Sequence, residues 1–451
     1  MQTDIRVQEV EASFSPEEFR TPLKFGTGVV SAITGLTVRA RVETRAGQVA
    51  DGWGHILLSD LWSYPGNVPH ELRDLAMRDL AETFCKLLAE QTDWAHPLDL
   101  YLRLKPELSR LAAEVTARRS LAEPFPLLAA LVSASPADAA LHDAFGRAHG
   151  ISSYDGYGPD FVDHDLSVWC GPEFRGKHLS DYLRSSNQTA LPIFHLVGGV
   201  DKLRRAEVTA EDPQDGLPVS LEEWIERDGL CCFKIKLRGH DIDWDVERTA
   251  EVAEVIVATY ERLGQSGEFF LSTDSNETNE SPATVVEYLE KLQRRSPLAY
   301  ARLLYVEQPT ERDLSGHRFD MREVTRHKPV IADEGITDVD KLRLARELGW
   351  SGVGLKTCKG HSASLLYMAM CTEFGMPYTL QDLTNPGLSL VHQAGLAARI
   401  STLKGFEYNA RQFLPNASPE LQARHESLFT VRDGHVLTES LAPVGLGYRL
   451  E

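Results

Sequence analysis

Short apolar runs that end in charged residues recur through the second half of the chain. They read FKIK, FFLSTD, LLYVEQP, PVIADE and GVGLK, and each is followed by a segment with helical spacing. Strand and helix units of about 30 residues are typical of a (β/α)₈ barrel, whose active site collects at the C-terminal ends of the strands. The pattern therefore predicts one barrel mouth that gathers the following charged residues: Lys234, Lys236, Asp274, Glu307, Asp333 and Lys356.

Three of these residues are carboxylates from three consecutive predicted strands: Asp274, Glu307 and Asp333. Oxygen ligands of this kind suit Mg²⁺, and the sequence has no Cys/His cluster with zinc spacing to compete. A cation held in this way stabilises the enolate that forms when a base removes the proton alpha to a carboxylate. We therefore predict a magnesium site. The alternative is that the carboxylates cap the helices after the strands.

The lysines supply a candidate base. Lys234 and Lys236 alternate with Ile235, so both amines point to the same side of their strand. Lysines crowded near a cation and near one another are expected to have lowered pKa values, which lets one of them remove a proton near neutral pH. The alternatives are one solvated strand face for the first pair and a surface position for Lys356. We expect Lys359 at the surface.

Taken together, these motifs resemble the enolase superfamily, specifically the muconate lactonizing enzyme branch of the mandelate racemase/muconate lactonizing enzyme family. The resemblance is carried, in family order, by KIK at 234–236, Asp274-Ser-Asn276, Glu307-Gln308-Pro309, Asp333-Glu334 and Lys356 in GVGLKTCKG. It extends to the N-terminal strands and to the C-terminal DGHVLTESLAPVGLGYRLE. The resemblance implies a modified TIM (β/α)₇β barrel with an N-terminal α+β capping domain that the C-terminal tail completes.

The resemblance also implies roles for single residues. Lys236 and Lys356 correspond to the two acid/base groups on opposite faces of the substrate, and Lys234 to the group that binds its carboxylate. The mandelate racemase branch proper uses a His/Asp pair on the sixth and seventh strands, so the lysine at the sixth strand argues against that branch. Glu334 is expected on the other face of its strand from Asp333. Asn276 either shapes a turn or contacts a metal-bound water.

Three further residues are candidates for the cavity lining. Asp382, after PYTLQ, is the strongest and is assigned to substrate binding, although it could instead cap the helix near Asn385. His195 lies on the first predicted barrel strand and is a weaker candidate. Glu407 alternates with Phe406 and Tyr408, which favours an outward position.

The order of segments predicts three parts: a cap over residues 1–190, a barrel over 191–410 and a tail over 411–451 that returns to the cap. In the cap we expect strands at 5–14, 36–44 and 49–56, followed by helices within 72–88 and 127–148. The resemblance implies that two cap loops, 21–28 and 53–66, close over the barrel mouth. Trp53, His55, Trp62 and Tyr64 either form a lid there or pack the cap core.

Composition narrows the choice of partners. Lys+Arg 47 against Asp+Glu 66 gives a net charge of -19, which argues against nucleic acid or an anionic membrane as a partner. The 6 cysteines show no paired framework, and the N-terminus lacks the features of a signal peptide. We expect a cytoplasmic protein that binds a small-molecule carboxylate substrate and forms a homo-oligomer.

The fate of the enolate divides the possible functions. Two lysines at the alpha carbon favour a racemase or epimerase, loss of a beta leaving group would make the enzyme a dehydratase of hydroxy acids or acid sugars, and ring closure or opening a cycloisomerase. In another class, a Schiff-base aldolase would use Lys236 or Lys356 as its nucleophile but has no use for three converging carboxylates. A noncatalytic barrel is expected to lose one of the charged positions, and all are present.

Overall fold

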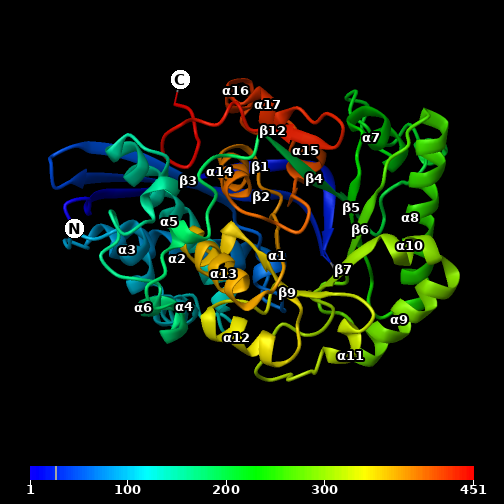
Figure 1. Cartoon of the computed structure of the whole chain (residues 1–451), viewed down its shortest axis with the longest axis horizontal. Coiled ribbons are helices and arrows are strands. Elements are labelled where there is room, and N and C mark those ends of the chain that lie inside the picture. Colours follow the sequence, from blue (N-terminus) through cyan, green and yellow to red (C-terminus); the bar gives the residue numbers. More distant parts are fainter. Residues whose placement is uncertain (26–27, 451) are drawn as a thin grey trace.

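A closed barrel of parallel strands lies beside a three-stranded antiparallel sheet flanked by helices (Figure 1). The computed structural model describes residues 1–25 and 28–450. Barrel strands follow one another around the ring in sequence order, and the last pairs with the first. The predicted fold class, a (β/α)₇β barrel with an N-terminal α+β cap completed by the C-terminal tail, is confirmed.

Eight strands form the ring. They are β4 (Ala190–Val197), β5 (Cys232–Lys236), β6 (Phe270–Asp274), β7 (Leu303–Glu307), β8 (Val330–Ala332), β9 (Gly352–Leu355), β10 (Tyr378–Leu380) and β11 (Phe406–Glu407). The helices between them are α7 (Leu221–Asp228), α8 (Ile242–Leu263), α9 (Pro282–Arg295), α10 (Pro297–Arg302), α11 (Arg322–Thr325), α12 (Val339–Glu347), α13 (His361–Phe374) and α14 (Gly387–Arg399).

Local sequence signals set the ends of several barrel helices. Ser220 caps α7 in a reciprocal capping box with Glu223, which satisfies amides at the start of the helix. Asp241 accepts a hydrogen bond from the amide of Trp244 at the start of α8. Gly264 ends α8 with φ 66°, a conformation that glycine adopts without steric cost.

Cap elements come first in the chain. The strands are β1 (Ile5–Phe25), β2 (Gly28–Thr44) and β3 (Val49–Leu57), and the helices are α1 (Asp60–Ser63), α2 (His70–Ala89), α3 (Pro97–Leu104), α4 (Glu107–Arg118), α5 (Leu127–His149) and α6 (Ser167–Cys170). β1 and β2 are longer than predicted, because the pairing continues past Pro16 and Glu17 up to Phe25 opposite Gly28. The loop expected at 21–28 is therefore the end of a hairpin, and residues 26–27 of it lie outside the described residues.

This extended hairpin forms an arm that reaches the barrel. Arg20 donates from Nε to Asp215 Oδ2 at 2.6 Å and from Nη2 to Asp215 Oδ1 at 2.8 Å, on the loop between β4 and α7. Ile33 and Leu57 of the cap pack with Leu196 of β4 and Phe413 in a small apolar cluster. The arm is thus fixed to the barrel by an ion pair and by apolar contacts.

After the barrel, the tail contains α15 (Ala410–Phe413), α16 (Pro419–Arg424), α17 (Glu426–Phe429) and β12 (His435–Leu437), which pairs antiparallel with β4. Its last residues contact the cap, since the amide of Ser153 donates to the carbonyl of Gly445 at 2.9 Å. Arg147 also donates to the carbonyl of Tyr448 at 2.6 Å. The expected domain limits at 190/191 and 410/411 remain predictions.

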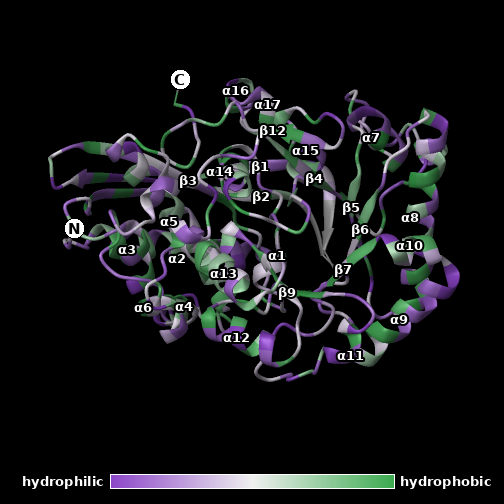
Figure 2. Cartoon of the chain, in the orientation of Figure 1, coloured by the Kyte–Doolittle hydropathy of each residue, from purple (hydrophilic) through white to green (hydrophobic). Residues whose placement is uncertain are grey.

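Hydropathy follows the layers of the barrel (Figure 2). Strands β6 and β7 are largely green, whereas the outer helices α8 and α9 alternate purple and green. Helix α13 differs, because it is buried from His361 to Cys371 between the barrel and the cap helix α5.

All 6 cysteines are free thiols. Within residues 1–25 and 28–450, no helix combines the length and apolar character needed to cross a membrane.

Candidate active site

The strand register brings the predicted charges to one level at the barrel mouth. Lys236 of β5 pairs with Asp274 of β6, which pairs in turn with Glu307 of β7. Asp333 directly follows β8, and Lys356 directly follows β9. Parallel strands in register align their C-terminal ends, so the charged residues at the ends of these five strands meet at one mouth.

Lys234 lies at the centre of this cluster. Its Nζ is 2.7 Å from Glu307 Oε1, 2.7 Å from Glu407 Oε1 and 3.1 Å from Asp274 Oδ2. An ammonium group has three N–H donors, and three carboxylates surround this one. The Lys234 side chain is only 3% exposed. In this arrangement the lysine neutralises part of the negative charge that the buried carboxylates bring into the barrel.

Lys236 is the more accessible lysine of the pair, with its side chain 21% exposed. It donates to Asp274 Oδ2 at 2.5 Å and to Asn276 Oδ1 at 2.9 Å. The amide of Asn276 also donates to Asp274 Oδ1 at 2.8 Å. Asn276 therefore shapes the turn after β6 and holds both Asp274 and Lys236 in place.

On the far side of the ring, two lysines hold Asp333. Lys356 Nζ is 2.7 Å from Asp333 Oδ2, and it lies 4.4 Å from the centre of the Trp62 ring. Lys359 donates to the Asp333 carbonyl at 2.8 Å and lies 3.2 Å from its Oδ1. The surface position expected for Lys359 is wrong, since this residue is 1% exposed, and the alternative surface position of Lys356 does not hold either, since it is 4% exposed. Helices α5 and α13 cover this part of the barrel mouth.

Glu334 also faces the site, contrary to the expectation that it points away from Asp333. Its Oε1 accepts from Trp62 Nε1 at 2.8 Å and from Asn276 Nδ2 at 3.2 Å. Strict alternation does not apply, since β8 ends at Ala332 and both acidic residues lie in the following turn. Glu334 thus links the cap, through Trp62, to the strand ends.

Backbone strain is concentrated at the same strand ends. Asn276, Glu277 and Gln308 have positive φ values of 46°, 71° and 27°. Such conformations cost about 1–3 kcal/mol each and cluster at functional sites. Gln308 in return accepts from the Asp333 amide at 2.8 Å through its Oε1, so this strained residue positions the acidic turn.

The close ion pairs shift several pKa values. Burial raises the pKa of Asp274, but the charges of Lys236 and Lys234 outweigh it and hold the pKa below its usual range. Burial and the charge of Asp274 raise the pKa of Glu307 well above its usual range. Burial lowers the pKa of Lys356, but the charge of Asp333 dominates and the net pKa is raised. The lowered lysine pKa expected from the sequence is therefore not found for Lys234 or Lys356, because the neighbouring carboxylates raise the pKa of both amines.

The three further candidates for the cavity lining, Glu407, Asp382 and His195, lie in different places. Glu407 faces into the barrel, where it bonds Lys234, so the favoured outward position is wrong. Asp382 caps no helix; its two oxygens accept from the backbone and side-chain nitrogens of Asn409 at 3.0 and 2.6 Å. Burial and the charge of Glu407 raise the pKa of Asp382 to about 6. His195 lies on the outer face of β4, where its Nδ1 accepts from Arg411 at 2.9 Å.

Of the four lid candidates, Trp62 lies at the site. The carbonyl of Trp62 accepts from Arg312 Nη1 at 3.1 Å, which fixes α1 over the mouth. His55 bonds Ser389 of α14 at 3.3 Å, at the seam between cap and barrel. Trp53 packs edge-to-face on Tyr448. Tyr64, the fourth candidate, is buried in the cap and packs edge-to-face on a phenylalanine ring.

The acidic cluster has a donor set that suits a hard cation. Glu307 Oε2 and Glu334 Oε2 are buried and have no hydrogen-bond partner among the described residues. Such orphaned carboxyl oxygens are costly unless a cation or a donor satisfies them. The lysines take part of this role here. Among the described residues, the group whose possible metal-ligand atoms already lie within 4.8 Å of one another is in the cap, at Asp99, Asp163 and His164.

Comparison with known proteins places the chain in a family. Residues 217–451 match the family model described as enolase C-terminal domain-like. The chain belongs to the enolase superfamily. A search of curated protein sequences gave no match. As in other members of this superfamily, the chain is an enzyme.

Solved structures share the fold across nearly the whole length of the chain. A dipeptide epimerase from Enterococcus faecalis V583, complexed with Mg and L-Leu-L-Tyr, has 17% identity and a TM-score of 0.61, covering 98% of this chain and 99% of its own. A mandelate racemase/muconate lactonizing enzyme from Bordetella bronchiseptica RB50 has 17% identity, a TM-score of 0.62 and coverage of 99% and 98%. A muconate lactonizing enzyme from Pseudomonas fluorescens, complexed with muconolactone, has 16% identity, a TM-score of 0.58 and coverage of 99% and 97%. At these identities the likeness shows the fold.

Sequence reasoning missed several residues that this enolase-superfamily site uses. Arg312 forms a half-buried ion pair with Glu277 and holds the Trp62 carbonyl, although neither belongs to a motif. Local pattern predicts a surface position for Lys359 and an outward position for Glu407, and both predictions are wrong. The EQP motif offered one signal that could have been read further, because a glutamine directly after a strand-terminal glutamate can reach the next strand end, as Gln308 does by accepting from the Asp333 amide.

Proposed function

We propose that the protein removes the alpha proton of a small carboxylate substrate and returns it, as a racemase or epimerase. The observation that supports this most is the placement of two lysines across the ring. Lys236 belongs to β5 and Lys356 follows β9, and three strands separate β5 from β9 in either direction around the closed barrel. Two bases on opposite sides of a mouth can reach opposite faces of one planar carbon.

Asp274, Glu307 and Asp333 are the residues that would hold Mg²⁺, and the bound ion would supply the positive charge that stabilises the enolate oxygens. The same carboxylates now contact Lys234 and Lys356. If a metal ion replaced the lysine ammonium groups as the partner of these carboxylates, Lys234 would be able to bind the substrate carboxylate. This replacement would also remove the charge that raises the pKa of Lys356. Asp382, 4% exposed, is kept as a candidate for substrate binding at the edge of the site.

Proton exchange in D₂O tests the two-base assignment. Each enantiomer of a panel of N-acylated amino acids, dipeptides and acid sugars is followed by proton NMR. Lys236→Ala should lose exchange with one enantiomer and keep it with the other, and Lys356→Ala should do the reverse. Lys341→Ala, at a solvent-facing lysine of α12 that bonds Ser315, is the matched control and should behave as wild type. Equal loss for both enantiomers in both variants would rule the assignment out, and elimination of a beta substituent would identify a dehydratase.

Metal binding is tested separately from activity. Asp274→Asn and Glu307→Gln should lower the Mg²⁺ content measured by elemental analysis and abolish turnover, while the circular dichroism spectrum stays unchanged. Asp99→Asn, in the acidic group of the cap, is the control and should leave turnover intact. Full activity of EDTA-treated protein without detectable metal would refute this part of the proposal.

The structure offers no support for a Schiff-base aldolase. Asp274, Glu307 and Asp333 converge at the mouth, and a lysine nucleophile that attacks a carbonyl carbon has no use for three carboxylates. Borohydride reduction with a carbonyl substrate should therefore leave no mass increase on the protein.

A further inference from the structure

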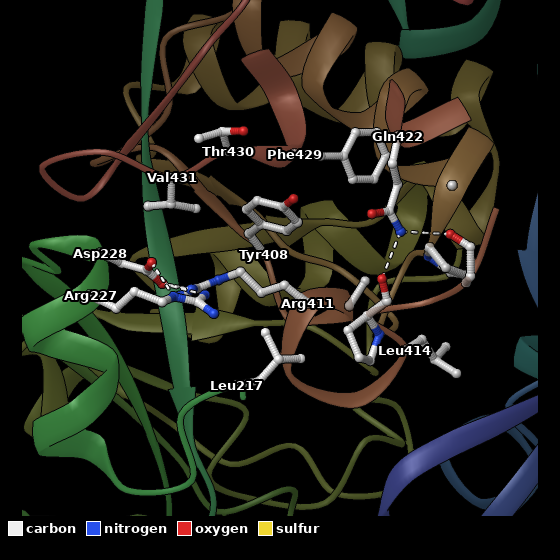
Figure 3. A pocket seen from close by; sticks show the side chains of 15 residues that line it. Leu217, Arg227, Asp228, Tyr408, Arg411, Leu414, Gln422, Phe429, Thr430 and Val431 are labelled. Atoms are coloured by element: carbon white, nitrogen blue, oxygen red, sulfur yellow. Dashed lines mark hydrogen bonds and ion pairs between the residues drawn. The ribbon is translucent and has the colours of Figure 1, made fainter. Parts of the chain in front are cut away.

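A cavity with a charged end and an otherwise apolar wall lies outside the barrel lumen (Figure 3). It has a volume of about 340 Å³ and is formed by the end of α7, the start of α14, α15 and the tail. Liquid water occupies about 30 Å³ per molecule, so this cavity could hold on the order of ten waters or a small organic molecule. Tyr408 lies in its wall, one residue after Glu407, which points into the barrel. The cavity thus borders the outer face of a strand whose inner face carries active-site charge.

One end of the cavity carries more positive than negative charge. Asp228 is the one acidic side chain among the described lining residues, and two arginines share it. Arg227 donates to Asp228 Oδ1 at 2.7 Å from Nε and to Oδ2 at 3.0 Å from Nη2, and Arg411 Nη1 bonds the same Oδ2. Burial and the two arginine charges lower the pKa of His195, which stays neutral beside them. Two guanidinium groups and one carboxylate leave a net charge of +1.

The arginines keep donors that the protein does not use. Arg411 is 9% exposed, and its Nε has no hydrogen-bond partner among the described residues. Arg227 uses Nε and Nη2 on Asp228, and its side chain is 38% exposed. Burial lowers the pKa of both guanidinium groups, as expected where positive charge is short of a counter-ion. A buried, unsatisfied donor of this kind is costly unless a ligand oxygen accepts from it.

The rest of the wall is apolar. Carbon-rich side chains surround the charged end in Figure 3, and the apolar lining residues are Leu217, Tyr408, Leu414, Pro415, Phe429 and Val431. Phe429 and Val431 are half-buried, so part of each side chain faces the cavity. The first residue of α14, Gly387, also lines it, and this helix has no side-chain cap at its start, which favours an anion nearby. Small-molecule sites typically combine such an apolar wall with a few convergent polar groups.

We propose that this cavity binds a small carboxylate with an apolar body, its carboxylate on Arg227 and Arg411 and its body against Phe429 and Val431. One net positive charge suits a monoanion. Such a ligand would occupy a site separate from the barrel lumen. The arginine-bearing segment Ala410–Phe413 follows β11, whose Glu407 accepts a hydrogen bond from Lys234. Occupancy of the cavity would therefore stiffen β11 and, through Glu407, the position of Lys234.

The probe for this site is 4-bromobenzoate, whose bromine can be located in crystals by anomalous scattering. We expect a bromine peak between Phe429 and Val431, and saturable binding by isothermal titration calorimetry. Arg227→Met removes the exposed guanidinium and leaves the pair of Asp228 and Arg411 intact, so binding should weaken at least tenfold. The uncharged 4-bromobenzamide should not bind measurably.

Two controls separate this site from its surroundings. Arg262→Met changes an arginine of α8 that pairs with Glu226 outside the cavity, and it should bind the probe as wild type does. Lys356→Ala removes a barrel lysine and should also retain this binding, which makes the result independent of the proposed reaction. If Arg227→Met does not fold, Thr430→Glu places a competing carboxylate in the wall and should abolish binding. A bromine peak confined to the barrel mouth, or unchanged affinity in the folded Arg227→Met protein, would overturn the proposal.

Discussion

A group of buried histidines at the seam between cap and barrel makes stability depend on pH. His142 Nε2 bonds Ser362 Oγ at 2.8 Å, and Ser362 donates from its amide and its hydroxyl to Asp138 at 2.8 and 2.6 Å. The His361 ring lies 4.9 Å from that of His142, and neither of its nitrogens has a partner among the described residues. Burial lowers the pKa of His96, His142 and His361 to about 3.

The direction in which stability changes with pH follows from the protons bound by the folded and the unfolded protein. An unfolded histidine titrates near 6.5, so below that pH the unfolded chain takes up protons that the folded chain does not. Stability is therefore lost as the pH falls from 6.5 towards 3. At pH 5 each such histidine costs about 2 kcal/mol, since one pKa unit corresponds to about 1.4 kcal/mol. Burial raises the pKa of Asp138 to about 6, which opposes this loss by about 1.4 kcal/mol because the folded state then binds the extra proton.

His361→Phe isolates one of these groups. The new ring keeps the apolar contacts and loses no hydrogen bond, although its shape could cost about 1–3 kcal/mol at every pH. The drop in the free energy of unfolding between pH 7.5 and pH 5.0 should be about 2 kcal/mol smaller than in wild type. Equilibrium urea unfolding, followed by circular dichroism and tryptophan fluorescence with coincident transitions, measures both values.

The matched control is His317→Phe, the same change at an exposed histidine, which should leave the pH dependence of wild type. An identical drop in wild type and His361→Phe would show that this histidine is protonated in the folded protein or reached by solvent. The assignment of the seam as the acid-sensitive part of the fold would then be wrong.

Three further variants test single contacts. Trp62→Phe keeps an aromatic ring but removes the buried hydrogen bond to Glu334, so KM should rise about tenfold and the free energy of unfolding should fall by about 1–3 kcal/mol, as measured by steady-state kinetics and urea unfolding. Lys359→Met removes the amine that holds the Asp333 carbonyl, and kcat should fall at least tenfold with an unchanged circular dichroism spectrum; unchanged kcat would contradict a positioning role. Ser220→Ala removes the cap of α7 and should cost about 1 kcal/mol in urea unfolding with no effect on KM.

The barrel and its charged mouth were predictable because both follow from local pattern. Each strand is a short apolar run, and the residue that ends it falls at the mouth by the geometry of parallel strands. Lys236, Asp274 and Glu307 needed only this rule to be brought together. Their register in the structure agrees with it, since all three pair across neighbouring strands.

Other features depend on contacts between distant parts of the chain. Lys359 is polar and follows a strand end, so nothing local indicates that the cap buries it. Glu407 alternates with two aromatic residues, which suggests an outward position in an ordinary sheet. At a barrel mouth the inner face carries the charges instead, and Phe406 and Tyr408 face the helices. The arm continues through Pro16 and charged residues because its partner strand, more than the sequence of β1, decides where pairing stops.

The arm has a consequence for how such an enzyme can diversify. Its two strands pair with each other up to Phe25 and Gly28, so residues can be added or removed between them in the sequence without shifting the register of any barrel strand. Lengthening a connection costs little, about 0.6 kcal/mol for each doubling of its length. Arg20 and Asp215 then act as a fixed attachment point from which a longer or shorter tip would extend. Insertion in this one hairpin would therefore alter the surface beside the loop between β4 and α7 and leave Lys236, Asp274 and Lys356 in place.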